Sequence, residues 1–171
     1  MRYTINKNKY LNAAELLYLT SMTAKDGSRN GLLIKLALAT GARAQELLNL
    51  TKADLDIENQ TIFIKGLKNS NDRDIPLEKS LFNALLALPL KENDQRLFPI
   101  GYDRLNDIWA FWTPNKTKTF HSLRHTFAIE LYRRTKDLLL VQAALGHRNI
   151  QNSLVYTEHL YQNEYLKGIL A

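Results

Sequence analysis

The sequence contains no cysteine, which excludes a disulfide framework and any metal site built on thiolates, and which suits a reducing compartment. It has no apolar run near the roughly 18 residues that a membrane-spanning helix needs, and its N-terminus carries no charged-then-apolar signal. Internal repeats, low-complexity segments and linkers are also missing. These absences predict one soluble, cytoplasmic domain over residues 1–171.

The sequence is basic, and it has enough apolar residues for a packed core. Apolar residues make up 45% of the chain, which argues against disorder. There are 23 Lys and Arg against 17 Asp and Glu, so the formal net charge is +6. This excess favours a polyanionic partner, and charge alone leaves DNA, RNA and an anionic membrane surface open.

Helix signals organise the first fifty residues. Residues 1–11 show little periodicity, and we interpret them as an N-terminal arm rather than a packed element. Asn12 and Glu15 form a capping-box pattern that predicts a first helix. Its apolar side is expected to consist of Leu16, Leu17, Leu19 and Met22. The apolar run 32–39 predicts a buried central helix that ends in a left-handed conformation at Gly41, and a new helix begins near Arg43.

The pattern changes from helical to extended between residues 54 and 77. Residues 61–64 predict a strand, 65–72 a turn and 73–77 a second strand, which Pro76 favours at a sheet edge. Further helices are predicted at 78–88, 102–112, 121–135, 138–145, 150–155 and 161–170. The predicted fold is therefore mostly α with one small antiparallel β-sheet (α+β).

The histidines of the last third are candidates for phosphate or metal chemistry. His121 and Arg124 stand three positions apart at a predicted helix start, where an anion is favoured, although a capping histidine and a structurally paired arginine explain them better in isolation. His121 and His125 have the spacing of a helical zinc pair, but Ser122 replaces the glutamate of the metalloprotease pattern. With few further ligands available, we expect no metal site.

Arg43, Lys68 and Tyr156 are each ambiguous when considered alone. Arg43 lies beside apolar residues, where an unpaired charge is costly, and Glu46 is its nearest expected partner. Lys68, on a turn rich in Gly, Asn and Ser, fits a solvated hairpin tip. Tyr156 fits a core position, because a phenol with a pKa of about 10 is a poor nucleophile unless a base and positive charges assist it.

Five dispersed motifs together resemble the catalytic domain of the tyrosine recombinases, the phage integrase family. The motifs are Thr40-Gly-Ala-Arg43-Ala-Gln-Glu46-Leu, Lys68 with Asp74-Ile-Pro-Leu77, His121-Ser-Leu-Arg124-His125-Thr-Phe-Ala, Leu145-Gly-His147, and Tyr156-Thr157. Their order and spacing match the family from roughly Leu11 to Tyr156. The resemblance implies an enzyme that cleaves and rejoins DNA at specific sites through a 3′-phosphotyrosine, with no cofactor, metal or ATP.

The resemblance also implies how the residues would share the reaction. Arg43 and Arg124 would clamp the non-bridging oxygens of a DNA phosphodiester, a bidentate task that suits planar guanidinium groups. Tyr156 would attack the phosphorus, and Lys68 would protonate the departing 5′-oxygen.

The remaining matched residues would assist that step. His121 would take the phenol proton or orient the tyrosine, and His147 would donate to the phosphate. Glu46 and His125 are expected to support the site. Guanidinium, imidazole and ammonium donors would offset the charge of the transition state without a metal.

Double-stranded DNA is the implied partner, with no membrane association. The resemblance implies a homo-tetramer on DNA and a monomer or weak oligomer in isolation. The family's additional N-terminal core-binding domain is expected to be absent from this chain, so DNA binding should be weak and salt-dependent. The apolar tail 161–170 either packs on its own domain or exchanges onto a neighbouring protomer.

Two other functions stay open at this point. One is a type IB topoisomerase-like nicking and closing activity, since the chemistry is shared. The other is a DNA-binding regulator that keeps the fold without turnover. The implied source is bacterial, archaeal or phage-encoded, with a nucleoid-associated location.

Overall fold

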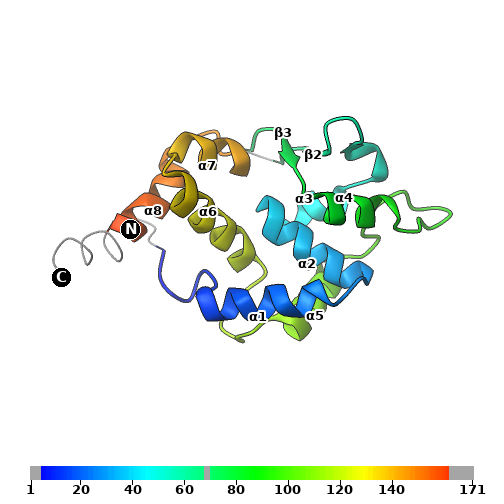
Figure 1. The fold of residues 1–171 in the computed structure, drawn as a ribbon, viewed down its shortest axis with the longest axis horizontal. Coiled ribbons are helices and arrows are strands. Elements are labelled where there is room, and N and C mark those ends of the chain that lie inside the picture. Colours follow the sequence, from blue (N-terminus) through cyan, green and yellow to red (C-terminus); the bar gives the residue numbers. More distant parts are fainter. Residues whose placement is uncertain (1–4, 68–69, 162–171) are drawn as a thin grey trace.

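The structure, a computed structural model, describes residues 5–67 and 70–161, most of them in helices (Figure 1). The elements in chain order are α1 (Ala13–Ala24), α2 (Arg29–Thr40), α3 (Ala44–Asn49), the 3₁₀ helix η1 (Lys52–Asp54), β1 (Leu55–Asp56), β2 (Thr61–Ile64), β3 (Arg73–Pro76), α4 (Lys79–Leu86), α5 (Tyr102–Trp112), α6 (His121–Thr135), α7 (Leu138–Leu145) and α8 (Gln151–Leu160). The predicted fold class is confirmed. Within the described ranges, no helix is both long and apolar enough to cross a membrane.

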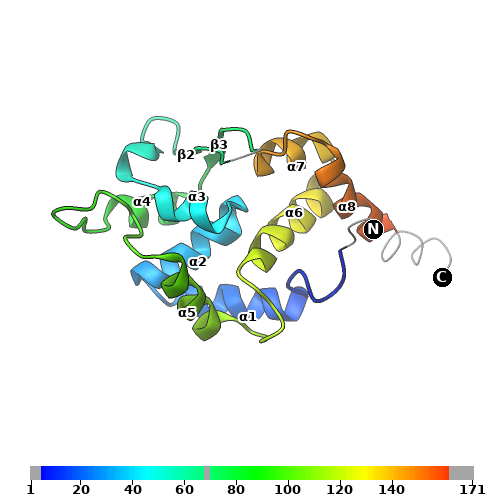
Figure 2. The same ribbon diagram turned by 180° about the vertical axis from the view of Figure 1, so that it is seen from behind.

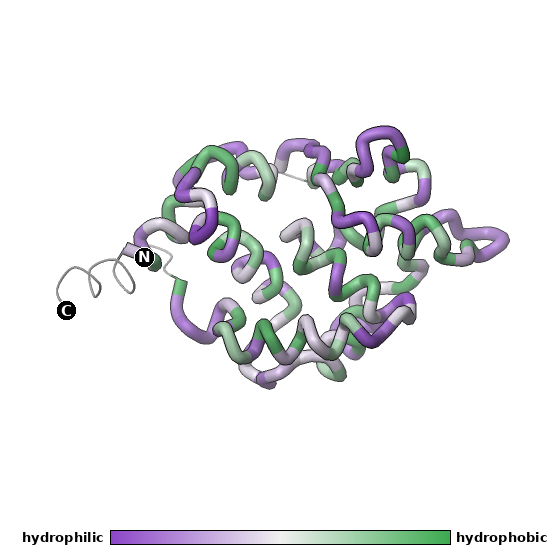
Figure 3. The backbone as a smooth tube through the Cα atoms, viewed as in Figure 1, coloured by the Kyte–Doolittle hydropathy of each residue, from purple (hydrophilic) through white to green (hydrophobic). Residues whose placement is uncertain are grey.

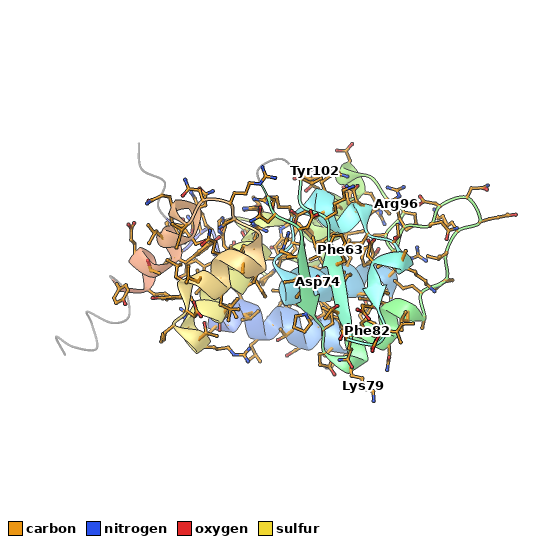
Figure 4. The ribbon with its side chains drawn as sticks, turned by 90° about the horizontal axis from the view of Figure 1, so that it is seen from above. Phe63, Asp74, Lys79, Phe82, Arg96 and Tyr102 are labelled. Atoms are coloured by element: carbon orange, nitrogen blue, oxygen red, sulfur yellow. The ribbon has the colours of Figure 1, made fainter. Side chains whose placement is uncertain are left out.

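The strands form one antiparallel sheet in the order β1-β2-β3, so β2 lies in the middle. Leu55 pairs with Ile62, and Ile62 pairs in turn with Ile75, and all three side chains are buried. Phe63 and Asp74 pair on the outer face, where Figure 4 shows them next to each other. The edge position predicted for β3 is confirmed, whereas the two-residue strand β1 was not expected.

Helix α2 is the centre of the fold, as the apolar run predicted. Leu33, Ile34 and Leu36 are at most 1% exposed, and α1, α4 and α6 pack around the helix. Gly41 ends it with φ +59°. A Cβ at Gly41 would lie 2.4 Å from Cδ1 of Phe127, so glycine also permits the close approach of α2 to α6.

Two apolar clusters make up the core, and α6 takes part in both. The larger cluster joins α2, α3, the sheet, α4 and α5, and the smaller one joins α6, α7, α8 and the N-terminal arm. Leu123 of α6 belongs to the first cluster and Ile129 to the second. Figure 2 shows α6 between the two groups, and Figure 3 shows α2 and α7 largely in the hydrophobic colour. Residues on α6 therefore face both halves of the molecule.

The described part of the N-terminal arm, residues 5–11, is packed, so the prediction of an unpacked arm is wrong there. Ile5, Tyr10 and Leu11 are buried. The backbone N–H of Leu11 donates to Oγ1 of Thr126 on α6 at 2.8 Å. These side chains fill gaps beside other helices instead of covering a regular face, which explains why the arm has no periodicity.

The buried face of α1 also differs from its prediction. Asn12 caps the helix as expected, but Leu17 is 68% exposed and Met22 is 41% exposed. Leu19 and Thr23 occupy the buried face. The Thr23 hydroxyl donates to the Leu19 carbonyl at 2.9 Å, and a hydroxyl satisfied within its own helix can be buried.

Helix α8 runs to Leu160, past the predicted end at residue 155, and Tyr156 therefore lies inside a helix. Beyond residue 161, the predicted tail helix 161–170 lies outside the described residues. The same holds for Lys68.

Candidate active site

One pocket collects most of the residues that the motifs selected. It has a volume of about 460 Å³ and opens between the start of α3, the N-terminal part of α6, and α8 with the loop before it. Its lining includes Arg43, His121, Arg124, His125, His147 and Tyr156. Segments more than one hundred residues apart in sequence therefore meet at one place.

Arg43 is held at the rim of this pocket by Glu46. Arg43 is the N-cap residue of α3, and its backbone N–H donates to Glu46 Oε2 at 2.9 Å. Its Nη1 donates to Glu46 Oε1 at 3.2 Å, so the predicted ion pair is confirmed. The Arg43 side chain is still 32% exposed, while that of Glu46 is fully buried.

Arg73 on β3 is a second partner of Glu46, and the sequence reasoning missed it. Its Nη2 donates to Glu46 Oε2 at 2.7 Å, and the residue is buried. Burial by itself would raise the pKa of Glu46, but hydrogen bonds from Arg73 and the Arg43 backbone, with the charges of Arg73 and Arg124, outweigh it and lower the pKa. The alternation of side chains along a strand could have revealed Arg73, because it places Arg73 on the same inward face of β3 as Ile75.

Arg124 is fixed by main-chain carbonyls at two helix ends. Its Nη1 donates to the carbonyl of Gly41 at 2.7 Å, and its Nη2 donates to that of Leu145 at 2.9 Å. These carbonyls lie at the C-terminal ends of α2 and α7, which favour a cation. Burial and the nearby charge of Arg43 lower the Arg124 pKa to about 10, so the guanidinium stays charged at neutral pH. Arg124 thus donates to main-chain carbonyls, whereas the alternative interpretation expected it to form a structural ion pair.

Tyr156 is buried, at 2% exposure, and its hydroxyl contacts His125. His125 Nδ1 lies 3.1 Å from Tyr156 Oη. Burial, followed by the influence of His121 and Arg124, lowers the pKa of His125 to about 3, so the ring is neutral at pH 7 and can accept a hydrogen bond from a phenol. The imidazole at the phenol is therefore His125, whereas the sequence reasoning had placed His121 there.

His121 is the first residue of α6, rather than its N-cap, and lies next to this pair. Its ring packs edge-on against the ring of His125, with centroids 4.7 Å apart. It is exposed to solvent yet lines the pocket, and loss of water on its inner side, together with the charges of Arg124 and Arg43, lowers its pKa to about 4.

His147 is positioned by the turn that follows α7. Gly146 ends α7 with φ +68°, and His147 Nδ1 lies 2.8 Å from Ser153 Oγ on α8. The His147 carbonyl accepts from Nε2 of Gln142 at 3.0 Å. Burial and the charges of Arg124, Arg43 and Arg73 lower the pKa of His147 to about 3. No feature of the sequence singled out Ser153.

The electrostatics of the pocket favour an anion. Arg43, Arg73 and Arg124 carry three positive charges around the buried carboxylate of Glu46, Glu158 adds a carboxylate to the lining, and the imidazoles beside them are held neutral. A site with excess guanidinium charge and several N–H donors suits a phosphate group. In the described part of the chain, no group of three or more His, Cys, Asp or Glu side chains is arranged to hold a metal ion.

The turn between β2 and β3 approaches the same place. Leu67, next to Lys68 in sequence, lines a smaller cavity of about 250 Å³ together with Arg43 and His121. Ser70 on the other side of Lys68 pairs with His147 in an isolated β-bridge. The two residues that flank the undescribed positions 68 and 69 thus both border the site.

Comparison with known proteins places this geometry in a family. The phage integrase family profile matches residues 9–163. Tyrosine recombinase XerA of Thermococcus kodakarensis is 30% identical over 169 residues, which cover 89% of this chain and 60% of the relative. The chain thus spans about three fifths of that relative's length.

Solved structures give the same result. A crystal structure of XerH site-specific recombinase bound to a palindromic difH substrate, a post-cleavage complex, superposes with a TM-score of 0.72 at 31% identity, over 94% of this chain and 52% of that one. The catalytic domain of bacteriophage HP1 integrase superposes with a TM-score of 0.66 at 25% identity, over 92% of this chain and 96% of that one. Sequence motifs, fold and site geometry agree, and this chain belongs to the phage integrase family.

Proposed function

We propose that this chain is the catalytic domain of a site-specific DNA recombinase, which breaks and rejoins DNA through a covalent bond to Tyr156. The observation that carries the proposal is a pocket in which Arg43, Arg124 and His147 surround a tyrosine whose hydroxyl contacts an imidazole. The near-complete coverage of the HP1 catalytic domain supports the extent of the unit. DNA binding by residues 1–171 alone is weak and salt-dependent, because a single domain neutralises few phosphates.

The proposed reaction is an in-line displacement at phosphorus. Tyr156 Oη attacks, its proton passes to a neutral imidazole, and the bond from phosphorus to the 5′-oxygen breaks. Lys68 supplies the proton that makes the leaving group a 5′-hydroxyl. A 5′-hydroxyl of another strand later attacks the phosphotyrosine and restores the phosphodiester, so no ATP is consumed.

The charged residues stabilise the transition state of this displacement. Arg43 and Arg124 bind the non-bridging oxygens, where negative charge accumulates. His147 donates a further hydrogen bond to the phosphate. Glu46 keeps Arg43 in place and does not react itself.

We assign the proton transfer from the phenol to the pair of His121 and His125. His125 is within hydrogen-bond distance of Tyr156 Oη, and its lowered pKa keeps an acceptor nitrogen available. His121, whose ring contacts that of His125, stands at the open side of the pocket near Arg43. His125 therefore contacts the nucleophile directly in this proposal, whereas the motif implied only a supporting role.

We further infer assembly as a homo-tetramer on double-stranded DNA, with the tail 161–170 of one protomer docked on the next. An apolar groove of about 800 Å³ between α1, α2, α4 and α6 supports this, since its lining includes Leu16, Leu38, Leu81 and Leu131. Sedimentation with and without DNA checks the assembly, and a chain that stays monomeric on its recombination site contradicts it.

The decisive test is covalent trapping on nicked DNA. A library of nicked duplexes with randomised sequence lets cleavage release a short strand, which leaves the protein joined to DNA. Wild type should give an adduct that survives SDS and heat, and Tyr156→Phe should give none, because it lacks the attacking oxygen. Tyr18→Phe, at an exposed tyrosine of α1 outside the pocket, is the matched control and should react like wild type.

Other outcomes separate the competing functions. Relaxation of supercoiled plasmid without any sequence requirement would indicate a topoisomerase-like activity. DNA binding without an adduct from any library member would indicate a regulator and would contradict the proposed function.

A further inference from the structure

A buried hydroxyl on the turn between β2 and β3 connects the start of α3 to the turn after α7. Ser70 is 3% exposed and lies two residues after Lys68. Its Oγ accepts a hydrogen bond from Arg43 Nη1 at 2.8 Å and donates one to the carbonyl of Gly146 at 3.1 Å. Ser70 is thus bonded at the same time to Arg43, at the start of α3, and to the turn that carries His147.

The main chain reinforces this contact. Ser70 pairs with His147 in a β-bridge, and the Asn71 N–H donates to the Gly146 carbonyl at 2.8 Å. A Cβ at Gly146 would lie 2.6 Å from the Asn71 carbonyl oxygen, so the glycine is what allows the two turns to touch. The hairpin turn is therefore docked on the loop after α7.

The chemistry of a hydroxyl suits this position. One hydroxyl donates a single hydrogen bond and accepts up to two, so donation to Gly146 leaves it free to accept from a guanidinium. Within the described residues, Arg43 makes its side-chain hydrogen bonds through Nη1 alone, to Glu46 and Ser70. Its Nε and Nη2 keep their donors for a phosphate.

We propose that Ser70 is a positioning residue of the strand-transfer reaction: it sets the orientation of the Arg43 guanidinium and locks it to the docked hairpin. This inference rests on the proposed function. A guanidinium held on one nitrogen presents its other donors in a fixed direction, which lowers the reorganisation needed when the phosphate arrives. Ser70 acts on the rate through Arg43 and touches no reacting atom.

The test measures single-turnover cleavage of saturating nicked DNA by Ser70→Ala, by Arg43→Ala and by the double variant. Loss of a hydrogen bond to a charged group predicts cleavage about 10- to 100-fold slower for Ser70→Ala. In the Arg43→Ala background the same change should slow cleavage by no more than about 2-fold, because its target is gone. Ser21→Ala, at an exposed serine of α1 outside both the pocket and the apolar groove, is the matched control and should leave the rate unchanged.

A modified substrate adds a readout that a purely structural role would not move. With methyl in place of one non-bridging oxygen, the scissile phosphate is neutral and depends less on a second guanidinium. The factor by which Ser70→Ala slows cleavage should then become smaller, as should the factor for Arg43→Ala. Ser70→Cys keeps a similar volume and bonds more weakly, so it should cleave at an intermediate rate and provides the test if Ser70→Ala does not fold.

Three results overturn the proposal. A wild-type rate for Ser70→Ala would show that the hydroxyl is not needed. An equal slowing in the wild-type and Arg43→Ala backgrounds would show that Ser70 acts independently of Arg43. Failure of wild type to form any adduct would overturn the proposed function, and this inference with it. The wild-type reaction alone distinguishes that result from the other two, in which wild type still cleaves.

Discussion

Arg43 and Arg124 carry the same group into one pocket but are held in different ways. Arg124 is 2% exposed and bonds to main-chain carbonyls at the ends of α2 and α7. The Arg43 side chain is 32% exposed and bonds to the side chains of Glu46 and Ser70. The fold itself fixes Arg124, while other side chains fix Arg43. Substitutions at Arg124 should therefore affect stability and catalysis together, and substitutions around Arg43 should separate them.

The largest effect is expected for Arg124→Ala. Loss of one phosphate clamp should slow covalent cleavage about 10²- to 10³-fold, and the two buried carbonyls left unsatisfied should each lower the unfolding free energy by about 1–3 kcal/mol. Arg43→Ala, the matched variant at the partly exposed arginine, should slow cleavage by a similar factor with little loss of stability. Single-turnover cleavage and urea denaturation measure the two quantities. Equal destabilisation by both variants would remove the proposed distinction.

Glu46→Gln should have the next largest effect, mainly on stability. The carboxylate neutralises Arg73, whose Nε and Nη1 are buried without a hydrogen-bond partner among the described groups. Removing one charge of a buried pair costs about 3 kcal/mol or more. Urea denaturation of Glu46→Gln, compared with Asp74→Asn on the exposed face of β3, checks this. A loss no greater than that of Asp74→Asn would show that Arg73 does not depend on the carboxylate.

The smallest effect, counted per histidine and per pH unit, is a dependence of stability on pH that arises from the imidazoles beside the two arginines. The pKa of His125 and that of His147 are lowered to about 3, against 6.5 ordinarily. Between pH 6.5 and pH 3, the unfolded chain therefore binds protons that the folded chain does not. The contribution of these histidines to the free energy of unfolding is complete above pH 6.5. It is lost as the pH falls toward 3, by at most about 1.4 kcal/mol per pH unit for each histidine.

Urea denaturation at pH 7 and pH 5 measures this dependence. His147→Gln removes one titrating group and keeps a polar side chain near Ser153, so its stability should fall less steeply with acid than that of wild type. Identical slopes for the two proteins would show that His147 does not titrate as proposed.

The elements of the fold could be predicted from local pattern where that pattern is strong. The capping box at Asn12, the left-handed Gly41 and the edge strand before Leu77 were predicted correctly, because each depends on backbone chemistry within a few residues. The packed arm around Leu11 was predicted wrongly, because its burial depends on gaps beside distant helices. Local signals reveal local structure, and they do not reveal what covers it.

The candidate site shows the same division. The motifs named Arg43, Arg124, His147 and Tyr156, and the ion pair of Arg43 with Glu46 follows from their spacing on one helix turn. Spacing could not show that His125 rather than His121 contacts the phenol, since both lie on the same side of α6 and α8 decides between them.

The sequence by itself determined the residue types of the pocket, the fold class and the family, because these are carried by short motifs and by helical and strand periodicity. Only the tertiary structure decided which groups touch. Arg73 joins Glu46 from a strand, Ser70 joins Arg43 to the turn at Gly146, and His125 meets Tyr156 across two helices. The physical reason is that hydrogen bonds act over about 3 Å, a distance that packing of remote segments sets.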